Sequence, residues 1–275
     1  MLLEGEDVLT MQPGRLRAVR WTEAAVVFQG AMHALNPVRR VGDQIAEAIH
    51  LHDKVTDRQA GTRVGELLEQ VGLPASYPHE LSGGQRQRVM IAMALACSPR
   101  LLIADEPTTA LDVMVQAQVL TLLEELRREL GLALLLITHD LSVLAETCER
   151  IAVMYAGRIV EEGPAAAVFE APAHPYTRAL AEAFPTIGDT ASRRNPHGLG
   201  GDPPDPRDLP SGCEFHPRCP VSVAECPTLD VKLWPAGQGR RAACIHVRDG
   251  RPELVYQVPP RPVGEDAPVH REVAP

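Results

Sequence analysis

Long apolar runs and lysine are both scarce in this 275-residue chain. The longest purely aliphatic stretch runs from Leu132 to Ile137, whereas a helix that crosses a bilayer needs about 20 apolar residues. The first residues, Met-Leu-Leu-Glu-Gly-Glu-Asp, carry neither the basic start nor the apolar stretch of a signal peptide. We therefore expect no signal peptide and no membrane anchor, so that any role at a membrane depends on a partner protein.

Positive charge is limited as well. The chain has 27 Lys and Arg residues against 36 Asp and Glu residues, its formal net charge is −9, and no basic block is longer than two residues. A protein that binds nucleic acid needs a positive surface to replace the counterions of the phosphates. The composition therefore argues against a nucleic-acid partner, and its 45% hydrophobic residues are ordinary for a soluble globular protein.

The six cysteines are unevenly placed, and the pair type Cys-x2-Cys that zinc sites usually use is absent. Four of them lie within 213–244, at Cys213, Cys219, Cys226 and Cys244. In a chain without a secretion signal, such a group favours a metal site over disulfides. Three interpretations are open: an iron–sulfur cluster, zinc with His216 or His246 as further ligands, or unligated thiols. Cys97 and Cys148 are expected to pack as small apolar residues.

Proline divides the chain, since residues 1–171 hold seven prolines and residues 172–275 hold eighteen. The first part has regular patterns, whereas the second is expected to be a loop-rich extension. Apolar patterns predict helices over 41–71, 82–97 and 113–130, and strands over 23–28, 101–104 and 132–137. Strand, helix and strand in succession over 101–137 form a βαβ unit, so the predicted fold class is α/β with a parallel sheet.

Acidic residues and a histidine follow two of the predicted strands. Asp105 and Glu106 come directly after the strand 101–104, and His139 follows the strand 132–137. Parallel strands end at the same edge of a sheet, where ligands bind in open α/β folds. There an aspartate suits Mg²⁺, a glutamate can orient or deprotonate a water, and a histidine can contact a phosphate. The alternative is that the two acids only cap the next helix.

The residues Ser82-Gly83-Gly84-Gln85 open the helix predicted over 82–97. Ser-x-x-Gln is a capping box, which satisfies free amides at a helix start. The two glycines indicate more, because residues without Cβ let the amides and the positive end of the helix dipole approach an anion.

In combination these residues resemble the ATP-binding cassette (ABC) family. Residues 81–89, Leu-Ser-Gly-Gly-Gln-Arg-Gln-Arg-Val, look like its signature motif, and 101–107 resemble the Walker B strand with its catalytic glutamate. Residues 110–112 resemble the D-loop, Gln29 the glutamine of the Q-loop, and His139 the switch histidine. All five occur in the order that the family has.

The resemblance implies a P-loop NTPase-like parallel sheet with an inserted helical subdomain, at about residues 30–97, and a loop-rich C-terminal extension. Glu106 and His139 would be catalytic. Contacts to ATP are implied for Gln29, Ser82, Gly83, Gly84, Gln85, Asp105 and Asp112. Of these, Asp105 and Gln29 would also reach Mg²⁺ through the nucleotide.

Further segments resemble the dipeptide and oligopeptide importers of this family, namely Leu35-Asn36-Pro37 and the residues 174–180, His-Pro-Tyr-Thr-Arg-Ala-Leu. The four grouped cysteines resemble the [4Fe-4S] site of that subfamily. The implied domains are a nucleotide-binding domain over 1–165, an extension over 166–260 and a disordered tail over 261–275. The implied partners are a second ABC ATPase subunit, in a homo- or heterodimer, integral permease subunits and indirectly a solute-binding protein, at the cytoplasmic face of a bacterial inner membrane.

One family motif has no counterpart in this sequence, the phosphate loop Gly-x-x-x-x-Gly-Lys-Ser/Thr (Walker A). The two lysines, Lys54 and Lys232, do not follow a glycine. The family places this loop upstream of the Q-loop, so we expect a chain truncated before the Q-loop strand. Residues 2–9 look like the strand that follows the loop and its helix in the family. The leading hypothesis is the ATP-hydrolysing subunit of a peptide importer. Alternatives are a non-catalytic half that offers its signature to a partner's ATP, a cluster-bearing redox module, or an inactive gene fragment.

Overall fold

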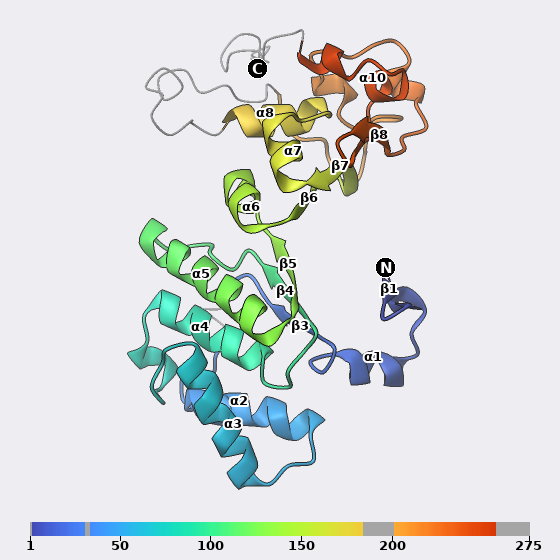
Figure 1. The fold of residues 1–275 in the computed structure, drawn as a ribbon. Helices are drawn as coiled ribbons and strands as arrows, with labels where there is room; N and C mark the ends of the chain where they lie inside the picture. Colours follow the sequence, from blue (N-terminus) through green and yellow to red (C-terminus); the bar gives the residue numbers. More distant parts are fainter. Residues whose placement is uncertain (1, 31–33, 184–200, 257–275) are drawn as a thin grey trace, which may run out of the picture. The chain divides into compact units, whose positions relative to one another are not determined.

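The computed structural model describes residues 2–30, 34–183 and 201–256 (Figure 1). The chain divides into two compact units, Met1–His139 and Asp140–Pro275, and each is described by itself. This division differs from the predicted boundary at 165/166, which follows motifs rather than contacts and stays a prediction. The predicted disordered tail over 261–275 lies outside the described residues.

A three-stranded parallel sheet lies at the centre of the first unit. Its strands are β3 (Ala24–Val27), β4 (Leu101–Asp105) and β5 (Ala133–Ile137), in the order β3-β4-β5. The helix α5 (Val113–Leu130) connects β4 to β5. The predicted βαβ unit and the α/β fold class are thereby confirmed.

The two faces of this sheet differ in their covering. In each strand alternate residues point to the same face, and the row Leu102 and Ala104 of β4 is buried in the main hydrophobic core. That core includes residues of α5 and of α4 (Gly83–Ala94), which pack along this face. On the other face Leu135 and Ile137 of β5 are each 45% exposed.

Helices form a second layer of the first unit. Helices α2 (Val41–His52) and α3 (Asp57–Gln70) correspond to the periodic segment 41–71, and both contact α4. Apolar residues at helical spacing form their buried stripes, as the sequence predicts. Helix α5 has the predicted bounds and ends at Gly131, whose φ of 63° is the left-handed conformation that glycine adopts easily.

The N-terminal segment corrects one prediction. Residues 2–9 form no single strand but an antiparallel hairpin of β1 (Leu2–Leu3) and β2 (Glu6–Asp7), followed by a 3-10 turn η1 (Val8–Thr10) and α1 (Pro13–Val19). Glu4 and Gly5 have φ values of 50° and 84° and reverse the chain, as two left-handed residues do in a tight hairpin turn.

The second unit is built on a four-stranded antiparallel sheet with the order β6-β7-β9-β8. Its strands are β6 (Arg150–Tyr155), β7 (Arg158–Pro164), β8 (Trp234–Gly237) and β9 (Arg240–Ala242). Its α-helices are α6 (Leu141–Thr147), α7 (Ala165–Glu170), α8 (Pro175–Ala183) and α10 (Ile245–Arg248). Between them run loops with the 3-10 turns η4 (His216–Arg218) and η5 (Cys226–Thr228), and η6 (Pro252–Tyr256) follows, in agreement with the high proline content.

Candidate nucleotide site and cysteine pocket

Glu106 is held at the carboxyl edge of the parallel sheet. It directly follows β4, and its amide donates a hydrogen bond to the carbonyl oxygen of Ile137 at 2.9 Å, so the ends of β4 and β5 are joined there. Its φ is 45°, a left-handed conformation that a residue with a Cβ adopts only at some cost. Such local strain is found preferentially at functional sites, where the surrounding structure enforces it.

Three side chains surround the carboxylate of Glu106. Its Oε2 accepts hydrogen bonds from Gln29 Nε2 and Thr109 Oγ1, both at 2.7 Å. Its Oε1 lies 3.3 Å from Nδ1 of His139. The structure therefore brings together three of the residues singled out from sequence, Gln29, Glu106 and His139, and adds Thr109.

Thr109 was missed because its position in the loop after the strand gives no signal of its own. Its hydrogen bond is the largest cause that lowers the pKa of Glu106, followed by His139, while Gln29 contributes less. Glu106 is therefore ionised at neutral pH, and as a carboxylate it can accept a hydrogen bond from a water.

Asp105 and Asp112 lie in different settings. Asp105 ends β4 opposite Ile137 of β5, at the same edge as Glu106, where its hard oxygens fit a Mg²⁺ ion that arrives with a nucleotide. Asp112 instead caps α5, because its Oδ1 accepts hydrogen bonds from the amides of Met114 and Val115 at 3.1 and 3.0 Å. A role of Asp112 toward ATP stays a prediction.

The signature residues open α4 as a reciprocal capping box. The amide of Gln85 donates to Ser82 Oγ at 3.3 Å, and the amide of Ser82 donates to Gln85 Oε1 at 2.9 Å. Both side chains are exposed, whereas Gly84 is buried. A Cβ on Gly84 would lie 2.3 Å from Cγ1 of Val115 in α5, so this glycine is required for the packing of α4 against α5. Gly83 begins α4 between these residues.

The four grouped cysteines line one pocket in the second unit, together with His174, Phe215, His216 and His246 among others. All four are free thiols, and Cys226 and Cys244 are buried. Among the described residues, no three His, Cys, Asp or Glu side chains are placed to hold a single metal ion.

Backbone amides act on the thiols of this pocket. The amides of Phe215 and His216 lower the pKa of Cys213, and the amide of Val221 lowers the pKa of Cys219. In the other pair, Val223 N lies 3.4 Å from Cys226 Sγ, and the amides of His246 and Val247 lower the pKa of Cys244. Amides that donate to sulfur stabilise thiolates, so this pocket suits a cofactor that binds several thiolates.

Burial opposes ionisation of these thiols in the metal-free protein. It raises the pKa of Cys219 to about 12 and that of Cys244 to about 11, and it also raises the pKa of Cys213. A bound metal reverses this preference, because a thiol loses its proton on ligation. In the first unit, burial raises the pKa of Cys97 to about 11, and this residue packs against the main core as expected of a small apolar side chain.

Comparison with known proteins identifies the family. The "ABC transporter" family model matches residues 2–109, and the model of the "Oligopeptide/dipeptide transporter, C-terminal region" matches residues 160–226. The dipeptide transport ATP-binding protein DppD of Escherichia coli K12 is 48% identical over 261 residues, which cover 91% of this chain and 78% of DppD. The chain belongs to the ABC transporter family.

Other members of the ABC family agree with this assignment. A putative peptide import ATP-binding protein of Brucella abortus strain 2308 is 48% identical over 229 residues, 81% of this chain and 68% of that protein. Among solved structures, cbiO1 of Clostridium perfringens, part of the ABC transporter complex cbiONQ, aligns with a TM-score of 0.55 and 29% identity over 62% of this chain and 67% of that one.

The fold is accordingly the P-loop NTPase-like α/β fold of ABC ATPases. The ATP-binding cassette MJ0796, solved as a dimer bound to ADP and phosphate, aligns with a TM-score of 0.50 and 29% identity over 57% of this chain and 68% of that one. None of the helices in the described part of the chain is long and apolar enough to cross a membrane.

Proposed function

We propose that this ABC protein is the ATP-hydrolysing subunit that energises the import of peptides through a membrane permease. The observation that carries the proposal is the group around Glu106, with donors from Gln29, Thr109 and His139 at the edge of the parallel sheet. Support also comes from the 48% identity to a dipeptide transport ATP-binding protein.

Each residue of this group has a separate task in the proposed reaction. Glu106, ionised, accepts a hydrogen bond from the attacking water and orients it toward the γ-phosphate. Gln29 and Thr109 share Oε2 of Glu106, which holds the carboxylate in one orientation. His139 is exposed, and with its Nδ1 proton directed at Glu106 its Nε2 is free to contact a phosphate oxygen. Asp105 would hold a Mg²⁺ ion that arrives with ATP, and the ion would supply charge that neutralises the phosphates.

The signature is proposed to act across a dimer. Ser82, Gly83 and Gln85 lie at the start of α4, where free amides and the helix dipole favour an anion. In a dimer of cassettes they would contact the ATP held by the second subunit, which Asp112 would also approach. The proposed location is the cytoplasmic face of the inner membrane, where permease subunits anchor the dimer.

The decisive experiment uses the complete transporter in proteoliposomes with a peptide-loaded binding protein. We expect phosphate release that depends on this chain and is stimulated by the peptide. If release is unchanged when Glu106 is replaced by Gln in this chain but lost when the partner's corresponding glutamate is replaced, this chain is the non-catalytic half. If no release occurs in the complete assembly, the proposal is wrong.

We also propose that Cys213, Cys219, Cys226 and Cys244 bind an iron–sulfur cluster of the [4Fe-4S] type. In a cluster each cysteine binds its own iron, so the four thiols need not converge on one ion as they do around zinc. The amide of Val223, which points at Cys226 Sγ, and the amides that lower the pKa of the other three thiols support this proposal. When bound, the cluster would supply a one-electron redox centre or a structural link. Anaerobic purification should give about four irons and four sulfides per chain with absorbance near 400 nm; one zinc per chain would disprove it.

A further inference from the structure

The four cysteines lie on separate short segments of the second unit, none of them within a long helix or strand. Cys213 and Cys219 flank η4, Cys226 begins η5, and Cys244 directly precedes α10. Short segments of this kind hold a fixed arrangement only if further contacts connect them, because each has few hydrogen bonds of its own.

The first connection joins the Cys213 and Cys226 segments through the main chain. The amide of Cys213 donates to the carbonyl oxygen of Cys226 at 3.0 Å. This approach requires Gly212, which has a φ of 69° and whose Cβ, if present, would lie 2.3 Å from that same oxygen. No sulfur takes part in this contact.

The other two connections both start from α10. Nε2 of His246, a residue only 7% exposed, lies 2.8 Å from the carbonyl oxygen of Val221, two residues after Cys219. Two residues further along α10, Arg248 forms a two-pronged ion pair with Glu225, with Nη1 to Oε1 at 2.5 Å and Nη2 to Oε2 at 3.2 Å. Glu225 directly precedes Cys226, so this four-residue helix reaches two other cysteine segments.

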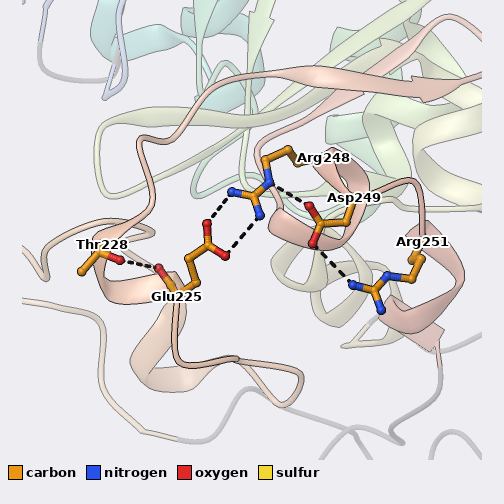
Figure 2. A network of polar contacts seen from close by, with 5 residues as sticks. All are labelled: Glu225, Thr228, Arg248, Asp249 and Arg251. Carbon is orange, nitrogen blue, oxygen red and sulfur yellow. Dashed lines mark hydrogen bonds and ion pairs between the residues drawn. The ribbon is translucent and has the colours of Figure 1, made fainter.

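Figure 2 shows how the ion pair is supported on both sides. Nε of Arg248 donates to Oδ1 of Asp249 at 2.8 Å, and Arg251 reaches Oδ2 of the same carboxylate at 3.5 Å. On the other side, Oγ1 of Thr228 donates to the carbonyl oxygen of Glu225 at 3.1 Å and closes the η5 turn. The guanidinium is thus oriented by Asp249 and aimed at the segment that carries Cys226.

We propose that α10 is a clamp in which Arg248 and His246 are positioning residues that hold the Cys226 and Cys219 segments in place against Cys244 for a thiolate-bound cluster. This inference rests on the cluster proposed above. The clamp acts on the chain and not on the metal, because both side chains end on oxygen atoms of neighbouring segments. It keeps the four thiols assembled when the pocket holds no cofactor and slows the release of iron when it does.

The test compares three single variants of the full chain, Arg248→Gln, Arg248→Lys and Arg251→Gln. An exposed ion pair contributes little to the stability of a fold, so R248Q should fold, and it should lose iron to a chelator roughly five-fold faster than the wild type. R248K keeps the charge and should recover part of the difference. R251Q removes the same charge and the 3.5 Å contact to Asp249, but it leaves the contacts of Arg248 with Asp249 and Glu225 intact, so it should match the wild type.

A second measurement needs no cofactor. In metal-free protein, hydrogen exchange of the segment around Cys226–Thr228 should be faster in R248Q and unchanged in R251Q. His246→Ala should accelerate exchange around Val221, and His246→Gln, which retains a donor, should restore part of the protection.

The outcomes separate the two proposals. If the wild type binds no iron or sulfide, the cluster proposal fails, and the exchange data still decide whether the clamp exists. If R248Q equals the wild type in exchange, or if R251Q equals R248Q in both measurements, the clamp is overturned.

Discussion

Glu106 has a left-handed backbone conformation and a carboxylate that three side chains contact. Its left-handed φ of 45° aims the side chain from the end of β4 toward Gln29 and His139, which come from the ends of the neighbouring strands. The three donors favour the ionised form and lower its pKa, with Thr109 as the largest cause. Glu106 is therefore suited to orient a water at neutral pH, and its charge persists into mildly acidic solution.

Replacing Glu106 by Gln should lower the rate of ATP hydrolysis by about 10²- to 10⁴-fold, the range for a lost general base. Gln keeps the size of the side chain but removes the charge that orients the water. Phosphate release by the complete transporter measures this, with the exposed Glu129→Gln on α5 as the control. A rate within a factor of two of the wild type, at unchanged ATP affinity, would exclude Glu106 as that base.

Gly84 lacks a side chain for two reasons. The absence of a Cβ lets an anion approach the start of α4, as the sequence predicts, and it also allows α4 to pack against Val115 of α5. Gly84→Ala should destabilise the protein by about 1–3 kcal/mol, because the new Cβ would overlap Val115 at 2.3 Å. Urea unfolding measures the loss, and a second change, Val115→Ala, should restore most of it. Gly61→Ala is the matched control in α3, where no atom lies within 4 Å of the added Cβ; it should stabilise by about 0.5–1 kcal/mol.

At the scale of elements, α5 is the one whose bounds were predicted without error. Its apolar stripe, the aspartate before it and the glycine after it all lie within or next to the helix, so they act on the chain locally. The hairpin of β1 and β2 was missed because the family resemblance implied a single strand over 2–9, whereas the chain reverses at Glu4 and Gly5.

The cap of α5 gives a prediction that separates two roles of Asp112. Asp112→Ala should destabilise the protein by about 1 kcal/mol, because the amides of Met114 and Val115 lose their acceptor. Asp112→Asn also caps and should retain nearly the full free energy of unfolding, as measured in urea. If the Asn variant nonetheless hydrolyses ATP more slowly in the complete transporter, Asp112 has a role beyond the cap.

At the scale of the whole second unit, a buried histidine should control stability in acid. His174 is only 1% exposed, and its Nδ1 accepts a hydrogen bond from the amide of Tyr176 at 3.1 Å, while the backbone of Ala243 raises its pKa to a smaller extent than burial lowers it. Burial lowers its pKa from 6.5 to about 3. The folded state therefore keeps His174 neutral at a pH where the unfolded chain binds a proton.

The sign of the pH dependence follows from this difference. The stability that neutral His174 provides is present above pH 6.5 and is lost as pH falls toward about 3. As pH falls through this window, the free energy of unfolding of the wild type should decrease by up to about 1.4 kcal/mol per pH unit relative to that of His174→Gln. The Gln variant keeps a donor and an acceptor but does not titrate. Unfolding of both proteins between pH 7 and pH 4 measures it; parallel curves, or a His174 NMR titration above pH 5, would contradict it.

The candidate nucleotide site could be located from sequence because the ends of consecutive parallel strands must meet at one edge. That rule places Asp105, Glu106 and His139 together before any side-chain contact is known. It does not supply the partners of the carboxylate, since the position of Thr109 depends on the path of the loop that follows Glu106. The cysteines were recognised as a group, but which of their segments touch depends on contacts up to 25 residues apart, such as that of His246 with Val221.

The sequence by itself determined the family, the βαβ unit and the ends of α5, because these depend on motifs and on residues that are neighbours in the chain. Only the tertiary structure decided which donors surround Glu106, why Gly84 must lack a Cβ, and how α10 joins the cysteine segments. These features arise where segments distant in sequence approach within van der Waals or hydrogen-bond distance, and no local pattern of residues encodes that approach.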